Sequence, residues 1–267
     1  MWTLLKIDFK KYFYSRAFWV MLAVYFALLV LFFFGVEKFV NEAFKSAGKS
    51  SPVTIPAFSI YAFPYVWHNL AYLGGFLKIF LVLIVLYFVT HEFSNKTIRL
   101  NIMNGMSRTQ FIISKLLFVI LLSLFSALVL FVSGFVLGFL HTEEITRAIV
   151  IQKAWFIPAY FLEVFTFGML AMFLGFLIRK PILSIGALAI YYYIAEPILA
   201  AVLPDKMAPY LPVEAMGNLI DVPNTALMQM FGVQFRDYVS VPDAITCIIY
   251  SVIFTLLTFL IYRKKDL

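Results

Sequence analysis

Long apolar runs alternate with short polar stretches along the whole chain. Six runs are close to the roughly 20 residues that a helix rising about 1.5 Å per residue needs to cross about 30 Å of hydrocarbon. These runs cover residues 17–36, 71–90, 116–140, 155–178, 182–203 and 244–262. The strict alternation that a transmembrane β-barrel strand requires is absent. The pattern predicts an all-α integral membrane protein with six transmembrane helices in a single transmembrane domain, residues 1–267.

The N-terminal residues have a different pattern. In residues 1–16, "MWTLLKIDFKKYFYSR", aromatic and aliphatic residues recur at helical spacing opposite lysines and an aspartate. This spacing predicts an amphipathic elbow helix that lies in the headgroup layer before the first span. A simple extension of the first transmembrane helix is the alternative.

A second unusual segment lies between the fifth and sixth spans. Its sequence "VEAMGNLIDVPNTALMQMFGVQF" is apolar but is interrupted by Gly217, Pro223 and Gly232. Backbone that enters the membrane without crossing it must be buried in protein. The segment therefore predicts a re-entrant or interfacial element.

The most polar patterned segment is residues 91–115, "HEFSNKTIRLNIMNGMSRTQFIISK", between the second and third spans. Asn95 or Thr97 can begin a short helix, and Gly105 stands where a left-handed C-cap would end it. "SRTQ" at 107–110 matches a capping box that starts the next helix. The segment therefore predicts one short surface helix fixed at both ends. An ordinary basic loop is the alternative.

Composition and charge support a membrane protein and orient it. The chain is 63% hydrophobic and only 13% charged, which lies far outside the range of soluble domains. Thirteen Lys and Arg residues fall on the side of the termini and seven on the other, whereas acidic residues divide three to nine. This bias predicts that both termini are cytoplasmic. The net charge of +7 is then a topology signal, and no nucleic-acid partner is expected.

Three charged residues lie inside predicted spans: Lys78, Glu163 and Glu196. Each lies about 10–12 Å from the outer end of its span at about 1.5 Å per residue. Because an ionisable group at that depth is costly, we hypothesise that Lys78 pairs with one glutamate in the translocation path and the other tunes substrate charge or protonation. Alternatively, Lys78 extends outward to the interface, and Glu196, which precedes Pro197, caps a broken helix.

No catalytic or cofactor chemistry is expected in this chain. "AGKSS" at 47–51 resembles the end of a phosphate-binding loop, but Ala43 stands where that loop needs glycine. His68, His91 and His141 share no helix face, so no metal site is expected. We also find no serine or cysteine nucleophile with a nearby base, so the chain is not expected to be an enzyme.

Several short motifs resemble those of the membrane subunits of the ABC type-2 exporter family. They are Glu92 after the second span, "TIR" at 97–99, "GMSRTQ" at 105–110 and Lys115 at the start of the third span. The C-terminal "YRKKDL" at 262–267 also resembles that family's usual ending. The order of elbow helix, six spans and a single sizeable cytoplasmic loop is similar as well.

This resemblance implies that residues 95–105 form a coupling helix seated in a groove of a separate ABC ATPase subunit. The implied coupling residues are Glu92, Thr97, Arg99, Gly105, Ser107 and Arg108. Two permease subunits, identical or related, would sit on two ATPase copies that bind the ATP. Such an exporter would move an amphipathic peptide, drug, lipid-like molecule or ion out of the cytoplasm across the cell inner membrane.

A different class of transporter also fits the intramembrane charges. An ion-coupled secondary transporter or channel would use Lys78, Glu163 and Glu196 as its ion or proton relay. That class predicts transport by the purified chain alone, driven by an ion gradient.

Overall fold

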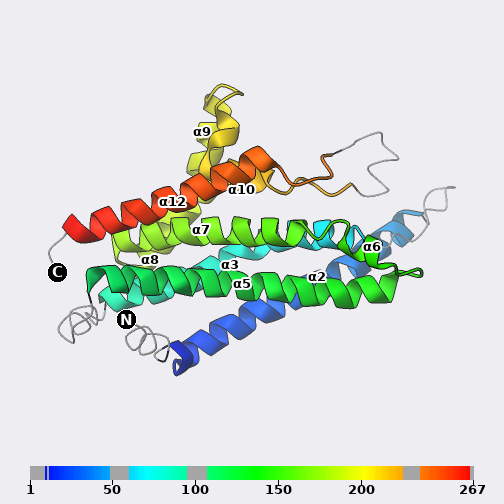
Figure 1. Ribbon diagram of the computed structural model, residues 1–267, viewed down its shortest axis with the longest axis horizontal. Coiled ribbons are helices and arrows are strands. Elements are labelled where there is room, and N and C mark those ends of the chain that lie inside the picture. The colour runs from blue at the N-terminus through cyan, green and yellow to red at the C-terminus, as the bar shows by residue number, and fades with distance from the viewer. Residues whose placement is uncertain (1–9, 11, 49–59, 95–106, 225–234, 265–267) are drawn as a thin grey trace.

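The computed structural model describes residues 10, 12–48, 60–94, 107–224 and 235–264, and every regular element in these ranges is helical (Figure 1). The elements are α2 (Arg16–Gly48), α3 (Val66–Ser94), α5 (Arg108–His141), α6 (Arg147–Ile151), α7 (Phe156–Ile178), α8 (Pro181–Ile190), η1 (Tyr191–Ala195), α9 (Glu196–Val202), η2 (Ala208–Tyr210), α10 (Pro212–Asn218) and α12 (Val241–Lys264).

Six helical segments are long and apolar enough to cross a membrane. They are Arg16–Val36, Val66–Ser94, Arg108–His141, Arg147–Ile178, Pro181–Val202 and Val241–Arg263. The expected all-α fold with six membrane-spanning helices is confirmed, and the chain is a multi-pass membrane protein. Several helices extend past the predicted spans, and α5 already begins at Arg108. A helix can continue beyond the hydrocarbon because its backbone hydrogen bonds do not depend on apolar side chains.

Helices α3, α5 and α7 form the centre of the bundle, and α7 packs against α3, α5 and α12. The ends of the bundle are distinct in Figure 1. At one end, which we call the proximal end, α2 begins, α3 ends, α5 begins and α12 ends. The opposite end, the distal end, carries α6 and the first turns of α7.

Small residues bring α7 close to its neighbours. A Cβ atom on Gly168 would lie 2.7 Å from Val119 Cγ1 of α5, and one on Gly175 would lie 3.0 Å from Val89 Cγ1 of α3. Helix association in lipid depends on such close packing, because burial of apolar surface gains little there.

The fifth span is irregular for a local reason. Arg179 adopts φ 62° at the end of α7, and Pro181 opens α8 at its first position, which gives a tight turn between the fourth and fifth spans. Pro197 then lacks an N–H donor, and the turn before it is the π-helix η1. After this turn, α9 leads away from the centre of the bundle and packs against α10 (Figure 1).

The element expected between the fifth and sixth spans includes the short helix α10. Its Pro212, Ala215 and Met216 are buried, and the helix packs against α12 and α7. Of the predicted N-terminal elbow helix, only residue 10 and residues 12–16 are described. Residues 10, 12 and 13 are helical, and α2 begins after a break at Ser15.

The close contact of α7 with α5 generates a stability prediction. Gly168→Ala should lower the free energy of unfolding by about 1–3 kcal/mol, because the new methyl group overlaps Val119. Gly186→Ala in α8 is the matched control, since its Cβ would meet nothing within 4 Å. Thermal unfolding of the detergent-purified variants measures both. Equal melting temperatures for the two variants would contradict the packing.

Candidate functional site

The start of α5 has the cap that the sequence predicts. Ser107 Oγ accepts a hydrogen bond from the Gln110 backbone N–H at 3.2 Å, and Gln110 Oε1 accepts one from the Ser107 N–H at 2.9 Å. This reciprocal pair satisfies two donors that a helix start otherwise leaves unpaired. The predicted capping box is therefore confirmed, and it fixes where α5 begins.

A buried ion pair joins the two helices that flank residues 95–106. Lys115 Nζ of α5 lies 2.8 Å from Glu92 Oε1 of α3, and the two side chains are 0% and 2% exposed. Tyr12 completes the cluster, because its hydroxyl accepts a hydrogen bond from Lys115 and donates one to Glu92 Oε1 at 3.1 Å. Breaking a buried pair by removing one partner typically costs about 3–5 kcal/mol. The pair therefore fixes α3 to α5 at the proximal end.

The other predicted coupling residues are placed as follows. Arg108 is partly buried and donates from Nη1 to the Arg263 carbonyl at 3.1 Å, which joins α5 to the end of α12. Thr97, Arg99 and Gly105 lie outside the described residues.

An aromatic cluster links the proximal ends of α3, α5, α7 and α12. Phe93, Phe111, Phe176 and Tyr262 come from α3, α5, α7 and α12, and neighbouring ring centroids lie 5.3 to 6.5 Å apart. Aromatic pairs at such distances contribute beyond the area that they bury. Four helix ends are thus held in one packed layer.

A second buried ion pair lies deeper in the bundle. Lys78 Nζ of α3 is 2.6 Å from Glu163 Oε1 of α7, and the side chains are 5% and 6% exposed. The ammonium also lies 5.6 Å from the ring centroids of Phe167 and Tyr192. The pairing of Lys78 with one glutamate is as hypothesised, and Lys78 does not extend outward to the interface.

Gly75 allows this approach of α7. A Cβ atom there would lie 2.9 Å from Glu163 Oε1, so a larger residue would displace the carboxylate. Beside the pair is a cavity of about 300 Å³ whose lining includes Lys78, Glu163, Asn218 and Asp221. A charged pair that borders a polar cavity can bind a small charged group or exchange a proton with one.

Glu196 is not part of this pair. Glu196 is buried and accepts hydrogen bonds from the backbone N–H groups of Val213 and of Glu214, the latter at 2.9 Å. These groups belong to the start of α10, so Glu196 caps that helix and holds it against the fifth span. Among the described residues, no hydrogen bond or ion pair joins Glu196 to Lys78.

The chain matches the model of the family described as "Protein of unknown function (DUF2705)" over residues 54–267. It belongs to this family. The Glu92–Lys115 and Lys78–Glu163 pairs of this DUF2705 member lie inside the matched range, whereas Tyr12 and α2 lie outside it. No curated protein matches the chain.

Two polar features of the DUF2705 chain were not found from sequence. Tyr12 is one of several aromatic residues at helical spacing in residues 1–16, and nothing nearby in the sequence marks its hydroxyl as a partner of Glu92 and Lys115. The hydroxyls of Tyr25, Ser126 and Tyr160 form a buried chain across α2, α5 and α7, with oxygen distances of 2.6 and 2.7 Å. Hydroxyl residues are frequent in apolar helices, so neither their spacing nor their number marks them as a network.

The Lys78–Glu163 pair generates the second prediction. Lys78→Met or Glu163→Gln alone should lower the free energy of unfolding by about 3–5 kcal/mol, because each leaves an uncompensated buried charge. The double variant should cost less than the sum of the two, since it removes both charges. Thermal unfolding of the three purified variants measures the coupling. Strict additivity would show that the two side chains do not interact.

Proposed function

We propose that this chain is the permease subunit of an ABC type-2 exporter, coupled to a separate ATPase subunit through residues 95–105. The observation that carries the proposal is the buried Glu92–Lys115 pair at the base of that segment. Both residues belong to the motif that resembles the exporter family. Because this pair joins α3 to α5, both ends of residues 95–105 are attached to fixed helices. A segment that receives force from another subunit needs such attachment.

The two ion pairs are connected by one continuous helix. Glu92 and Lys78 both belong to α3 and lie about 21 Å apart along it at about 1.5 Å per residue. A displacement of the proximal end of α3 therefore moves Lys78 relative to Glu163 on α7. In the proposed mechanism, ATP-driven movement of residues 95–105 alters the Lys78–Glu163 contact and the cavity beside it. In this mechanism, Glu196 keeps α10 packed against the helices that surround the cavity.

The proposal includes the topology and partners that follow from charge and resemblance. Both termini are cytoplasmic, because the Lys and Arg excess marks the inner side. The location in a cell inner membrane follows from the resemblance to the exporter family. Two such permeases, identical or related, work with two ATPase copies that bind the ATP. This subunit is not itself an enzyme, and it exports an amphipathic peptide, drug, lipid-like molecule or ion.

A charge reversal in the coupling segment tests the proposal. When the tagged chain is purified from its native membranes, an ATP-binding subunit should co-purify with it. Arg99→Glu should reduce the recovered ATPase about tenfold or more, since reversing one interfacial charge costs several kcal/mol. Arg147→Glu is the matched control, because Arg147 is exposed at the distal end.

Three results would contradict this function. The first is the same ATPase recovery from both variants, and the second is no ATPase recovery from the unaltered chain. The third is ion-gradient-driven transport by the purified chain alone in vesicles, abolished by Glu163→Gln. That third result would establish the ion-coupled transporter, which the buried pair beside a polar cavity favours as the alternative.

A further inference from the structure

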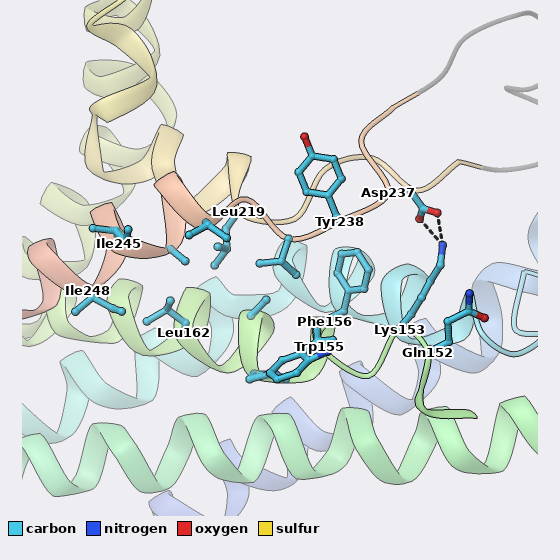
Figure 2. A pocket seen from close by; sticks show the side chains of 15 residues that line it. Gln152, Lys153, Trp155, Phe156, Leu162, Leu219, Asp237, Tyr238, Ile245 and Ile248 are labelled. Atoms are coloured by element: carbon cyan, nitrogen blue, oxygen red, sulfur yellow. Dashed lines mark hydrogen bonds and ion pairs between the residues drawn. The ribbon is translucent and has the colours of Figure 1, made fainter. Parts of the chain in front are cut away.

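A groove of about 650 Å³ lies at the distal end, between the first turns of α7 and the first turns of α12 (Figure 2). Its walls include Leu162, Ala244 and Ile248. Trp155 and Tyr238 also line it, and these two side chains, which are 76% and 67% exposed, flank its mouth-side opening to the surroundings. Tryptophan and tyrosine gather at the headgroup level of a membrane, so these two side chains place the mouth there.

The groove changes from polar to apolar along its length. Figure 2 shows Lys153 and Asp237 at one end and Leu162 and Ile248 at the other. Lys153 forms an ion pair with Asp237, whose Oδ1 also lies 3.4 Å from His68 Nδ1. The polar end is nearer the distal surface and the apolar end nearer the middle of the bundle. This is the direction in which a membrane lipid changes from headgroup to acyl chain.

The length of the groove distinguishes a lipid from a protein helix. Trp155 to Leu162 and Val241 to Ile248 each span about 10 Å of helix at about 1.5 Å per residue. One leaflet contributes about 15 Å of the roughly 30 Å of hydrocarbon. The groove therefore ends within one leaflet. It matches an acyl chain better than a transmembrane helix, which would continue through both leaflets.

The charges at the polar end favour one class of headgroup. Lys153 can attract a phosphate, while Asp237, whose side chain is 41% exposed, can accept hydrogen bonds from an amine. The two charges cancel, so an anionic headgroup would leave Asp237 facing a like charge. A quaternary amine has no N–H to donate to Asp237. A zwitterionic headgroup with a primary amine satisfies both residues.

We propose that this groove is a binding site for a phospholipid of the distal leaflet with a phosphoethanolamine headgroup. One acyl chain lies against Leu162, Ala244 and Ile248, and the headgroup contacts Lys153 and Asp237. The proposal does not depend on the transport role, because it rests only on the groove's shape and charge.

Lipid titration of the full chain tests this site. The lipid-depleted protein is mixed with phosphatidylethanolamine, phosphatidylcholine or phosphatidylglycerol of identical chains, and bound lipid is counted by native mass spectrometry. We expect the ethanolamine lipid to bind most tightly. Ala244→Trp should weaken binding about tenfold, because losing contact with about two methylene groups is sufficient for that change. Ile249→Trp is the control, since Ile249 is exposed on α12 outside the groove.

The headgroup and the occupant are tested separately. Asp237→Ala should remove the preference for ethanolamine over choline, because no side-chain acceptor remains for the amine, while the lipid still binds through its acyl chain. A photoreactive side chain, Ile248→p-benzoylphenylalanine, should form lipid adducts enriched in ethanolamine relative to the same substitution at Ile249. Three results would refute the site: equal lipid binding by Ala244→Trp and Ile249→Trp, equal binding of all three lipids, or cross-links from position 248 to a second copy of the protein.

Discussion

A charged side chain buried in a membrane bundle needs a counter-charge or hydrogen-bond donors on a neighbouring element, and this constraint organises the structure. Lys78 has Glu163 and Lys115 has Glu92, with both pairs almost fully buried. Each pair joins α3 to a different partner, α7 in the first case and α5 in the second. Separating the helices would leave a charge without its partner, and breaking such a buried pair costs several kcal/mol. The three central helices are therefore fixed by electrostatics as well as by packing.

The two pairs also give the bundle a direction. The Glu92–Lys115 pair closes the base of the polar segment, whereas the Lys78–Glu163 pair borders a cavity deeper in the bundle. Because α3 carries one member of each pair, one continuous helix joins the proximal end to the cavity. At the outer side, Glu196 at the start of α9 holds the start of α10, and α10 in turn packs against α12 and α7, so these short helices are joined to the central bundle.

Much of this architecture is present in the sequence, because length and hydropathy define membrane helices directly. The six spans, the capping box at Ser107 and the buried element before α12 follow from local patterns. Contacts between distant residues do not. Nothing local indicates that Glu196 caps a helix beginning at Pro212, or that Tyr12 meets Glu92, since both depend on how helices far apart in sequence pack. The sequence predicts that Lys78 pairs with a glutamate, because a charge inside a span needs an opposite charge nearby. Only the fold shows that this partner is Glu163 and not Glu196.

The central claim is that residues 95–105 receive mechanical work from another polypeptide. The most direct measurement is whether these residues lie in contact with an ATP-binding subunit. A photoreactive side chain in place of Ile102, introduced into the full chain in its native membranes, should cross-link to an ATP-binding subunit. The yield should change when a non-hydrolysable nucleotide is added. Cross-links that reach only lipid or a second copy of this chain, or labelling of this position from outside the intact cell, would contradict the account.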